Sequence, residues 1–248
     1  MIDLNADVGE EDDPGSVDLE LLDLVSSASV ACGFHAGNRA VMEATVAEAS
    51  RRGVTVGAHP SYNDREGFGR RPMEVDLVRL TDDIATQIGT LQDIAGSCGA
   101  SVRYVKAHGA LYNRMSVDES VALVVARAVT AFDNLALLVQ AQSVAVDAAL
   151  STGLEVATEA FADRAYLDDG QLAPRDVKGS VIDDPRQAAE QAVHLATEGR
   201  VRTVSGKWLE VRAESICLHG DTPGAAQRAA WVRRALEEAG VQVAAFAR

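Results

Sequence analysis

The stretch Arg39–His59, RAVMEATVAEASRRGVTVGAH, contains the unit that recurs along the chain. Its first part, Arg39–Arg52, predicts a helix, and Gly53 follows directly, where a left-handed glycine ends a helix at low cost. The β-branched and apolar run Val54–Ala58 predicts a strand. The polar side chain of His59 comes next. A helix, a glycine, a buried strand and a polar residue in this order are typical of an α/β protein.

The same order recurs from one end of the sequence to the other. We predict strands at Ile2–Leu4, Val30–Cys32, Val54–Ala58, Val102–Lys106, Leu135–Val139, Glu155–Thr158 and Ser215–Leu218, with a weaker one at Val241–Ala245. We predict helices at Arg39–Arg52, Val75–Ser97, Val117–Phe132, Val144–Leu150, Pro185–Thr197 and Ala225–Ala239. The series predicts one α/β domain over residues 1–248, a (β/α) barrel of about seven parallel strands. A doubly wound open sheet is the alternative.

Three segments depart from this rhythm. Ala160–Asp184 is rich in Asp and Gly and predicts a long loop, which in a compact domain is usually functional or mobile. Val201–Val211 predicts a hairpin that turns at Ser205-Gly206. The proline of Asp221-Thr222-Pro223 predicts the start of the last helix.

The chain is acidic, and this excludes some classes of partner. Its 248 residues carry 23 Lys and Arg against 37 Asp and Glu, a formal net charge of −14. Nucleic acids and anionic membranes would repel such a surface. The longest uncharged stretch, Leu24–Asn38, is too short to span a membrane. With no signal-peptide pattern at the N-terminus and three widely spaced cysteines, a reducing cytoplasm is the expected location.

Polar side chains follow the predicted strands, where both candidate folds place their sites. They are Asn5 and Asp7, His35, His59, Lys106 and His108, Gln140 and Gln142, Glu159, Asp163 and Arg164, and His219 and Asp221. Four of the five histidines occupy such positions. The fifth, His194, falls within a predicted helix, so we expect it to be structural. The sequence therefore predicts one site at the carboxyl ends of the strands.

Carboxylate and imidazole groups in this set allow two kinds of chemistry. Histidine titrates near neutral pH and can act as an acid or base, or can bind a divalent metal through its neutral ring. Asp7 with His35 and His59 would make a mixed site of the kind that zinc or manganese accepts. No HExxH or other short metal motif is present, so the residues leave the question of a metal open.

Cationic side chains accompany these groups. Arg70 and Arg71 lie in a glycine-rich segment and offer forked donors for a carboxylate or phosphate. Alternation places Lys106 and His108 on one face of a strand end, where a buried lysine needs an anionic partner. The sequence has neither a P-loop nor a strand-to-helix GxGxxG. A nucleotide would therefore be held by an unusual site or by a partner protein.

Several ordered motifs resemble one known family. They are Ile2–Glu10, Ala31–Gly37, Gly57–Pro60, Gly67–Arg71, Lys106–Asn113, Glu159–Tyr166 and Cys217–Asp221. Together they resemble the LamB/YcsF family, described as the A subunit of the prokaryotic 5-oxoprolinase. The resemblance implies a seven-stranded barrel related to glycoside hydrolases and polysaccharide deacetylases. It also implies ATP-dependent opening of 5-oxoproline (pyroglutamate) to L-glutamate together with subunits B and C.

This resemblance gives the candidate residues provisional roles. The catalytic set is Asp7, His59, Lys106 and His108, the substrate-binding set is Asn5, His35, Arg70, Arg164 and His219, and the metal candidates are Asp7, His35 and His59. ATP, with magnesium, is the expected cofactor. Two alternatives remain: a metal-dependent deacetylase or amidohydrolase acting on a carbohydrate or amide, and a non-catalytic substrate-binding protein.

Overall fold

The predicted strands pair in parallel and close into a barrel. The computed structural model describes residues 1–13, 18–220 and 224–247. Around the barrel lie β1 (Asp3–Val8), β2 (Ser27–Ala31), β3 (Thr55–His59), β4 (Val102–Val105), β5 (Ala136–Gln140), β6 (Glu155–Phe161) and β9 (Ser215–Leu218). β9 pairs with β6 on one side and with β1 on the other. The predicted (β/α) barrel of about seven strands is therefore confirmed, and the open sheet is excluded.

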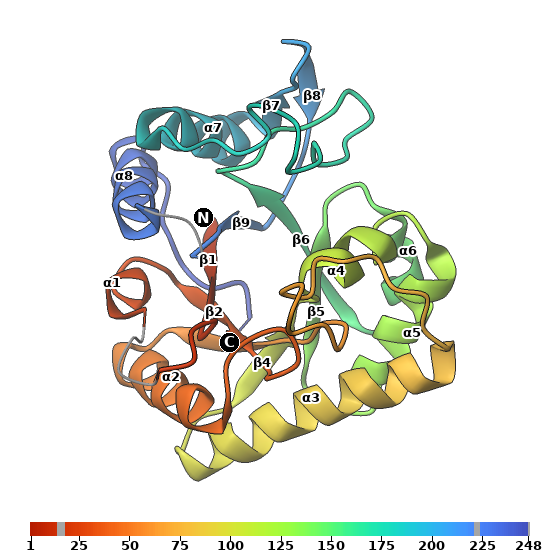
Figure 1. Cartoon of the computed structure of the whole chain (residues 1–248). Coiled ribbons are helices and arrows are strands. Elements are labelled where there is room, and N and C mark those ends of the chain that lie inside the picture. The colour runs from red at the N-terminus through yellow and green to blue at the C-terminus, as the bar shows by residue number, and fades with distance from the viewer. Residues whose placement is uncertain (14–17, 221–223, 248) are drawn as a thin grey trace.

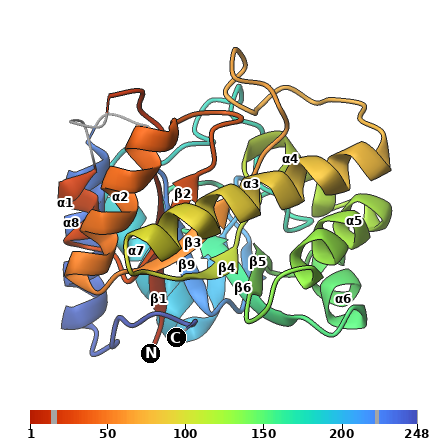
Figure 2. The ribbon, with the colours of Figure 1, turned by 90° about the horizontal axis from the view of Figure 1, so that it is seen from below.

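Helices surround this barrel on the outside (Figures 1 and 2). They are α1 (Leu19–Leu22), α2 (Arg39–Arg52), α3 (Leu77–Ser97), α4 (Gly109–Met115), α5 (Glu119–Thr130), α6 (Val144–Ser151), α7 (Pro185–Glu198) and α8 (Ala225–Glu238). In α2, the side chain of Asn38 accepts a hydrogen bond from the amide of Val41, and Gly53 ends the helix with a φ of 70°. The helices predicted from the sequence are present, each with ends shifted by no more than two residues.

Two helices were not predicted. The segment that follows Lys106 is typical of a strand end, yet Gly109 adopts a φ of 58° and begins α4, with His108 as its N-cap. The turn places the amide of Ala110 within 2.9 Å of the carbonyl oxygen of Gly69. The short helix α1 lies in the connection between β1 and β2. At α4, a contact with a residue distant in sequence therefore decides the conformation.

The interior of the barrel is polar, which changes where the strands end. Asp3, Asn5 and Asp7 alternate with Leu4, Ala6 and Val8 along β1, and all six side chains are buried. Ser26 and Ser27 donate hydrogen bonds of 2.6 and 2.7 Å to Asp3, and Asn5 donates one of 2.7 Å to Ser215. Burial raises the pKa of Asp3, and its serine partners oppose this. One face of the strand therefore meets a hydrogen-bonded interior.

This pairing corrects several of the predicted strand boundaries. Asn5, Asp7 and Glu159 lie within strands and not after them, and β2 begins at Ser27 instead of Val30. His59 and Gln140, which were also expected after strands, are the last residues of β3 and β5. The prediction ended the first and the sixth strand at Leu4 and Thr158, each before the polar residue that follows. The strands continue because the polar side chains that point into the barrel find hydrogen-bond partners there, so their burial costs little.

The remaining segments divide into confirmed and incorrect predictions. The hairpin is confirmed as β7 (Arg200–Arg202) and β8 (Trp208–Glu210), with Gly206 in the turn at a φ of 83°. The loop after β6 has no helix before α7. The weaker strand at Val241–Ala245 was wrong, since Val243 makes only an isolated bridge with Ile2. The predicted helix start at Asp221–Pro223 lies outside the described residues.

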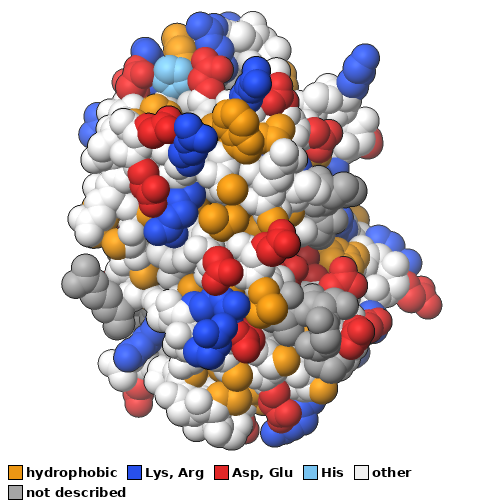
Figure 3. All heavy atoms as spheres, turned by 90° about the vertical axis from the view of Figure 1, so that its left-hand side faces the viewer, with side chains coloured by type: hydrophobic (Ala, Val, Ile, Leu, Met, Phe, Trp, Pro, Cys, Tyr) orange, Lys and Arg blue, Asp and Glu red, His pale blue; other side chains and the backbone are white. Residues whose placement is uncertain are grey.

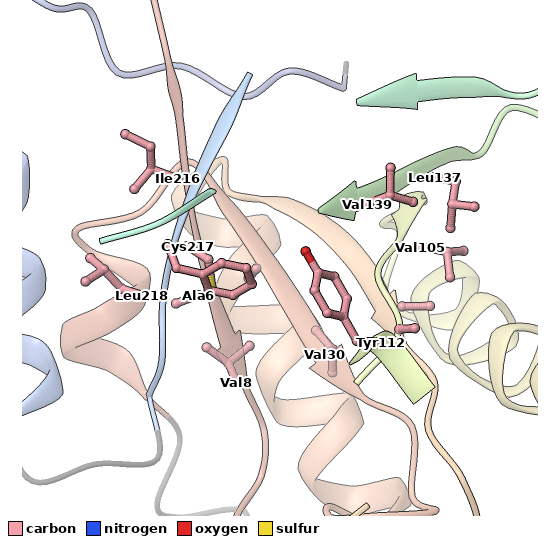
Figure 4. Close-up of a cluster of buried hydrophobic side chains, with 14 of the residues drawn as sticks. Ala6, Val8, Val30, Val105, Tyr112, Leu137, Val139, Ile216, Cys217 and Leu218 are labelled. Atoms are coloured by element: carbon pink, nitrogen blue, oxygen red, sulfur yellow. The ribbon is translucent and has the colours of Figure 1, made fainter. Parts of the chain in front are cut away.

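An apolar layer between strands and helices holds the fold together. Figure 4 shows part of it, including Val8, Val30, Val105, Leu137, Val139, Ile216 and Leu218. Each such side chain contributes about 1.5–3 kcal/mol relative to an exposed position. Tyr112 and Cys217 belong to the same cluster and also reach polar groups of the barrel interior. The site described below is therefore continuous with the core.

The acidic side chains on the outer surface are spread among basic ones. On the face shown in Figure 3, acidic and basic side chains are interspersed. Several ion pairs join neighbouring turns of a helix, such as Arg39 with Glu43 and Arg234 with Glu238. Among the described residues, no helix combines the length and the apolar character that crossing a membrane requires.

Gly57 offers a test of the barrel packing. A Cβ built there would overlap the ring of the buried Tyr104, so we expect Gly57→Ala to lower the free energy of unfolding by about 1–3 kcal/mol. Gly96, in the exposed last turn of α3, has no atom within 4 Å of a built Cβ. Gly96→Ala should raise stability by about 0.5–1 kcal/mol. Urea denaturation measures both, and equal effects would contradict the packing.

Candidate functional site

The carboxyl ends of the barrel strands border a cavity of 720 Å³. Its lining includes Asp7, His59, Arg70, Lys106, His108, Arg164 and His219, each of which the sequence predicts as a site residue. This size is within the range of about 300–1,000 Å³ that small-molecule pockets occupy. The other two predicted residues adjoin the lining: Asn5 contacts Lys106 deeper in the barrel, and His35 stacks on His108. The fold thus brings the predicted set together.

Lys106 occupies the centre of the barrel directly after β4, and only 2% of its surface is exposed. Its Nζ lies 2.8 Å from Asp7 Oδ1, 3.1 Å from Glu159 Oε1, 3.2 Å from Asn5 Oδ1 and 3.1 Å from Cys217 Sγ. Burial alone would lower the pKa of Lys106, but Asp7 and the other anionic neighbours raise it well above 10.5. Its predicted contact with a phosphate or oxyanion stays a prediction, because the ammonium is enclosed by the protein's own groups.

Asp7 is the carboxylate nearest to the histidines. Its Oδ1 accepts the hydrogen bond from Lys106, and its Oδ2 lies 3.4 Å from His59 Nε2. Burial would raise the pKa of Asp7, but His59 and Lys106 together lower it well below 3.8. Asp7 is therefore an ionised carboxylate with one oxygen directed towards an imidazole, which is the arrangement of an acid–base pair.

Glu159 completes the surroundings of Lys106. Its Oε1 accepts a 2.8 Å hydrogen bond from Asn5, and its Oε2 accepts a 2.9 Å bond from the hydroxyl of Tyr112. Burial raises the pKa of the Cys217 thiol well above 9.0, so the sulfur beside Lys106 stays protonated at neutral pH. Lys106 and two carboxylates thus share a hydrogen-bonded network, and Lys106 and Asp7 of this network line the cavity.

His59 and His108 face each other beside Asp7. His59 ends β3, and its Nδ1–H donates a 2.8 Å hydrogen bond to the carbonyl oxygen of Lys106. The Nε2–H of His108 donates a 2.9 Å bond to the carbonyl oxygen of Phe68. The two remaining ring nitrogens, His59 Nε2 and His108 Nδ1, lie 2.9 Å apart. Backbone carbonyls therefore fix the orientation of both rings.

His35 joins this pair from the loop after β2. Its ring stacks on that of His108, with centroids 3.9 Å apart and planes 3° from parallel. Its Nδ1 lies 3.0 Å from Ser61 Oγ, and its Nε2 lies 3.3 Å from Glu10 Oε1. Burial lowers the pKa of both His35 and His108 well below 6.5, and the neighbouring imidazoles lower it further. Both rings are therefore neutral at pH 7.

The turn at Phe68-Gly69 holds these rings in place. Phe68 adopts a φ of 55°, an uncommon conformation for a residue with a side chain, and its carbonyl oxygen accepts the bond from His108. Gly69 has a φ of 66°, and a Cβ there would lie 2.9 Å from both His108 and His35. The glycine-rich segment thus allows its backbone to approach the histidines closely.

A second carboxylate–imidazole pair lies across the cavity. Asp163 accepts a 2.9 Å hydrogen bond from His219 Nδ1 and another of 2.9 Å from the amide of His219. Burial would raise the pKa of Asp163, but His219 lowers it below 3.8. The ring also stacks on Phe161, with centroids 5.6 Å apart. Asp163 therefore orients His219, which lines the cavity.

Arginines supply further positive charge to the lining of the cavity. Arg164 donates a 2.7 Å hydrogen bond to the carbonyl oxygen of Ala173, and burial, with Arg175 nearby, lowers its pKa to about 10. Arg70 lies 4.9 Å from the ring centroid of Phe68. Arg70, Arg164 and Arg175 all line the cavity. Arg71, which the sequence also offers as an anion donor, instead pairs with Asp64.

Some functional groups were not assigned a role from the sequence. Glu159 and Asp163 were noted as following a strand, but their partners are about 50 to 150 residues away. Glu10 is in the first motif, yet a strand pattern does not place it near His35. In the structure, Gly9 has a φ of 70°, and Oε1 of the next residue, Glu10, lies 3.3 Å from His35 Nε2. The signal in the sequence that could have indicated Glu10 is the run of carboxylates that follows Asp7.

Taken together, the fold and the site define a parallel (β/α) barrel protein with buried carboxylates, histidines and cations at the carboxyl ends of its strands. A family model described as "LamB/YcsF family" matches residues 2–248 of the chain. The chain belongs to the LamB/YcsF family.

Curated relatives and solved structures agree with this membership. The chain is 49% identical to the A subunit of 5-oxoprolinase from Streptomyces avermitilis over the full length of both, and 47% identical to that of Kocuria rhizophila, covering 100% and 99% of the two chains. The crystal structure of the lactam utilization protein from Thermus thermophilus superposes with a TM-score of 0.92 at 44% identity over 99% of each chain.

More distant structures share the fold alone. A family 4 carbohydrate esterase from Streptomyces lividans superposes with a TM-score of 0.51 at 12% identity, over 98% of this chain and 90% of the esterase. A peptidoglycan deacetylase from Bacillus subtilis gives 0.50 at 15%, over 99% and 87%. The predicted likeness to the deacetylase group of barrels is therefore confirmed at the level of fold.

Removing the ammonium of Lys106 tests the electrostatics of the barrel. In Lys106→Met, Asp7 and Glu159 would remain buried without their cation, and we expect a loss of about 3–5 kcal/mol in the free energy of unfolding at pH 7. The folded pKa of Asp7 lies below its unfolded value, so the stabilisation is present above about pH 4 and is lost as the pH falls. The difference between wild type and variant should therefore shrink in acid.

The surface variant Lys207→Met serves as the control. Lys207 pairs with Asp168 at 2.7 Å but is exposed, so its removal should leave the unfolding free energy nearly unchanged. Urea titrations between about pH 3 and 7 measure all three proteins. A Lys106→Met protein as stable as wild type at pH 7 would contradict the ion-pair assignment.

Proposed function

We propose that this chain acts in the cytoplasm as the A subunit of an ATP-dependent 5-oxoprolinase, which opens 5-oxoproline to L-glutamate together with subunits B and C. The observation that carries the proposal is one cavity lined by an ionised carboxylate, by histidines and by arginines. Both expected ligands, 5-oxoproline and ATP, are anions and need cationic partners. The relatives that carry the name of the 5-oxoprolinase A subunit, at up to 49% identity over the whole chain, support this substrate.

The chemistry needs activation of a stable amide. Amide resonance protects the lactam carbonyl, so transfer of the γ-phosphoryl group of ATP to the carbonyl oxygen, with release of ADP, makes the ring carbon more electrophilic. Water then adds to this carbon, and the C–N bond breaks as the nitrogen takes up a proton. A second water releases the resulting acyl phosphate as glutamate and inorganic phosphate. A base for water and donors for negative charge are therefore required.

The cavity residues meet these requirements. In the proposal, Asp7, which His59 and His108 adjoin, accepts the proton of the attacking water, and Arg70 or Arg164 binds the substrate carboxylate. Lys106 keeps Asp7 ionised and stabilises the oxyanion that develops beside it. Asn5, His35 and His219 shape the substrate site. ATP enters with magnesium, and the absence of a P-loop from the sequence favours a contribution of the partner proteins to its binding.

A second candidate function has its own supporting observation. Ring nitrogens of His35, His59 and His108 lie close to one another and to a carboxylate oxygen of Glu10, as in metal-dependent hydrolases. A metal-dependent deacetylase or amidohydrolase would release its product, such as acetate from an acetylated carbohydrate, without ATP. ATP-independent release by zinc-loaded protein would favour this candidate over the first.

Reconstitution with the partner proteins tests the main proposal. Glutamate formed from 5-oxoproline is measured with the chain alone, with subunits B and C alone, and with all three, each with and without ATP. We expect glutamate only from the complete mixture with ATP, in proportion to the ADP released. A complete mixture without activity would contradict the proposal. Full activity from B and C alone would reduce the chain to a substrate-binding role, and calorimetry with 5-oxoproline would then measure its affinity.

Asp7→Asn tests the proposed base within the reconstituted complex. The substitution removes the proton acceptor and keeps the shape of the side chain, so we expect kcat for glutamate formation to fall at least about 100-fold. Asp82, exposed on α3, provides the matched control Asp82→Asn, which should retain wild-type kcat. An Asp7→Asn complex with near-normal kcat would exclude this role for Asp7.

A further inference from the structure

Four ligand atoms converge beside the cavity. They belong to Glu10, His35, His59 and His108, and one nitrogen or oxygen from each lies within 4.8 Å of the other three. The three rings are almost completely buried, with exposed fractions of 1%, 1% and 4%. The residues come from β3 and from the loops that follow β1, β2 and β4. The closure of the barrel, and not a local sequence motif, brings them together.

The hydrogen bonds of His59 and His108 decide which ring nitrogens carry protons. A backbone carbonyl oxygen only accepts hydrogen bonds, so His59 Nδ1 and His108 Nε2 must both carry a hydrogen. In neutral rings, His59 Nε2 and His108 Nδ1 are then both without one. These two lone pairs face each other at 2.9 Å. Such a contact is repulsive unless a cation, either a proton or a metal ion, lies between them.

His35 and Glu10 distinguish a metal ion from a proton. Ser61 Oγ donates its hydrogen to the carbonyl oxygen of Tyr62 at 2.9 Å, so it can accept one from His35 Nδ1 at 3.0 Å. The Nε2 of His35 then presents a third lone pair, 3.3 Å from Glu10 Oε1. The same carboxylate oxygen lies 3.5 Å from His108 Nδ1. A shared proton needs two partners, whereas this cluster offers four, and Oδ2 of Asp7 also lies 3.4 Å from His59 Nε2.

We infer that Glu10, His35, His59 and His108 bind one divalent transition-metal ion, of which Zn²⁺ is the best match. Three imidazoles and a carboxylate are ligands that zinc accepts in tetrahedral geometry. Atoms bonded at about 2.0–2.1 Å in a tetrahedron lie about 3.3–3.4 Å apart. Three of the six separations, 2.9, 3.3 and 3.5 Å, are close to this value, and all four ligand atoms lie within 4.8 Å of one another.

The surroundings of the cluster match those of metal ligands elsewhere. A metal-bound histidine usually donates its other ring N–H to a carbonyl or carboxylate, which fixes the ring. Here the acceptors are the carbonyl oxygens of Lys106 and Phe68 and the hydroxyl of Ser61. The close approach of Gly69 holds two of the rings against each other. His59 and His108 also line the 720 Å³ cavity, so the ion would adjoin the substrate space.

Direct metal titration tests this inference. The purified full chain is stripped with EDTA, dialysed and titrated with Zn²⁺ alone by calorimetry at pH 7. We expect one ion per chain, and His35→Ala and His108→Ala should each weaken its binding at least about 100-fold. Glu10→Gln keeps the side-chain shape and should weaken binding about tenfold. The surface variant His194→Ala, on α7, should bind as wild type does.

Two further measurements show whether a variant has lost a metal ligand or has failed to fold. Circular dichroism of the metal-free variants reports the fold, and Zn²⁺ should raise the Tm of wild type and of His194→Ala but not of His35→Ala or His108→Ala. Co²⁺ in place of Zn²⁺ should give visible absorption bands of a tetrahedral nitrogen and oxygen site. A folded wild-type chain that binds less than one ion, or a folded His108→Ala protein with undiminished affinity, would overturn the inference.

The inference does not rest on the proposed function. The titrations contain neither ATP nor 5-oxoproline and need no partner protein. A chain that binds zinc but fails in the reconstituted assay would leave the metal site standing and reject the oxoprolinase role. A chain that is active in the reconstituted assay but does not bind zinc would support the oxoprolinase role and reject the metal site.

Discussion

The ammonium of Lys106 lies inside the barrel among groups from three other strands. Asn5 and Asp7 come from β1, Glu159 from β6 and Cys217 from β9, while Lys106 itself follows β4. Burying such a charge costs several kcal/mol unless oppositely charged partners surround it. The strands must therefore close for the lysine to be stable, and the lysine compensates the two carboxylates. The geometry of Asp7, and through it the relation to the histidines, depends on this interaction.

A polar interior gives this barrel its site. In many parallel barrels the interior is filled with apolar side chains, but here β1, β2 and β9 point Asp, Asn and Ser side chains inward, and these bond to one another. The apolar side chains of the same strands face the helices. Ionised and neutral groups can consequently stand side by side at the carboxyl end, since a hydrogen-bonded layer below them compensates their burial.

Local pattern predicted much of this arrangement and failed at identifiable places. The strand series, the long helices and the hairpin followed from runs of apolar residues and from glycine stops, which act over a few residues. The predicted strands stopped before Asn5, Asp7 and Glu159. From the sequence a polar residue at a strand end is expected to be exposed, and its hydrogen-bond partner, about 100 or more residues away, cannot be identified. Helix α4 was missed for the same reason, since its start at Gly109 depends on a contact with Gly69.

The sequence by itself determined the fold class, the end of the barrel that carries the site, and most of the residues that line it, because these follow from hydrophobic periodicity and from where polar residues stand relative to strands. Tertiary structure alone decided which of these residues touch. It enclosed Lys106, paired Asp163 with His219 and turned three imidazoles towards Glu10. Spacing along the chain carries no information about such contacts, since closure of the barrel sets the distances between strand ends.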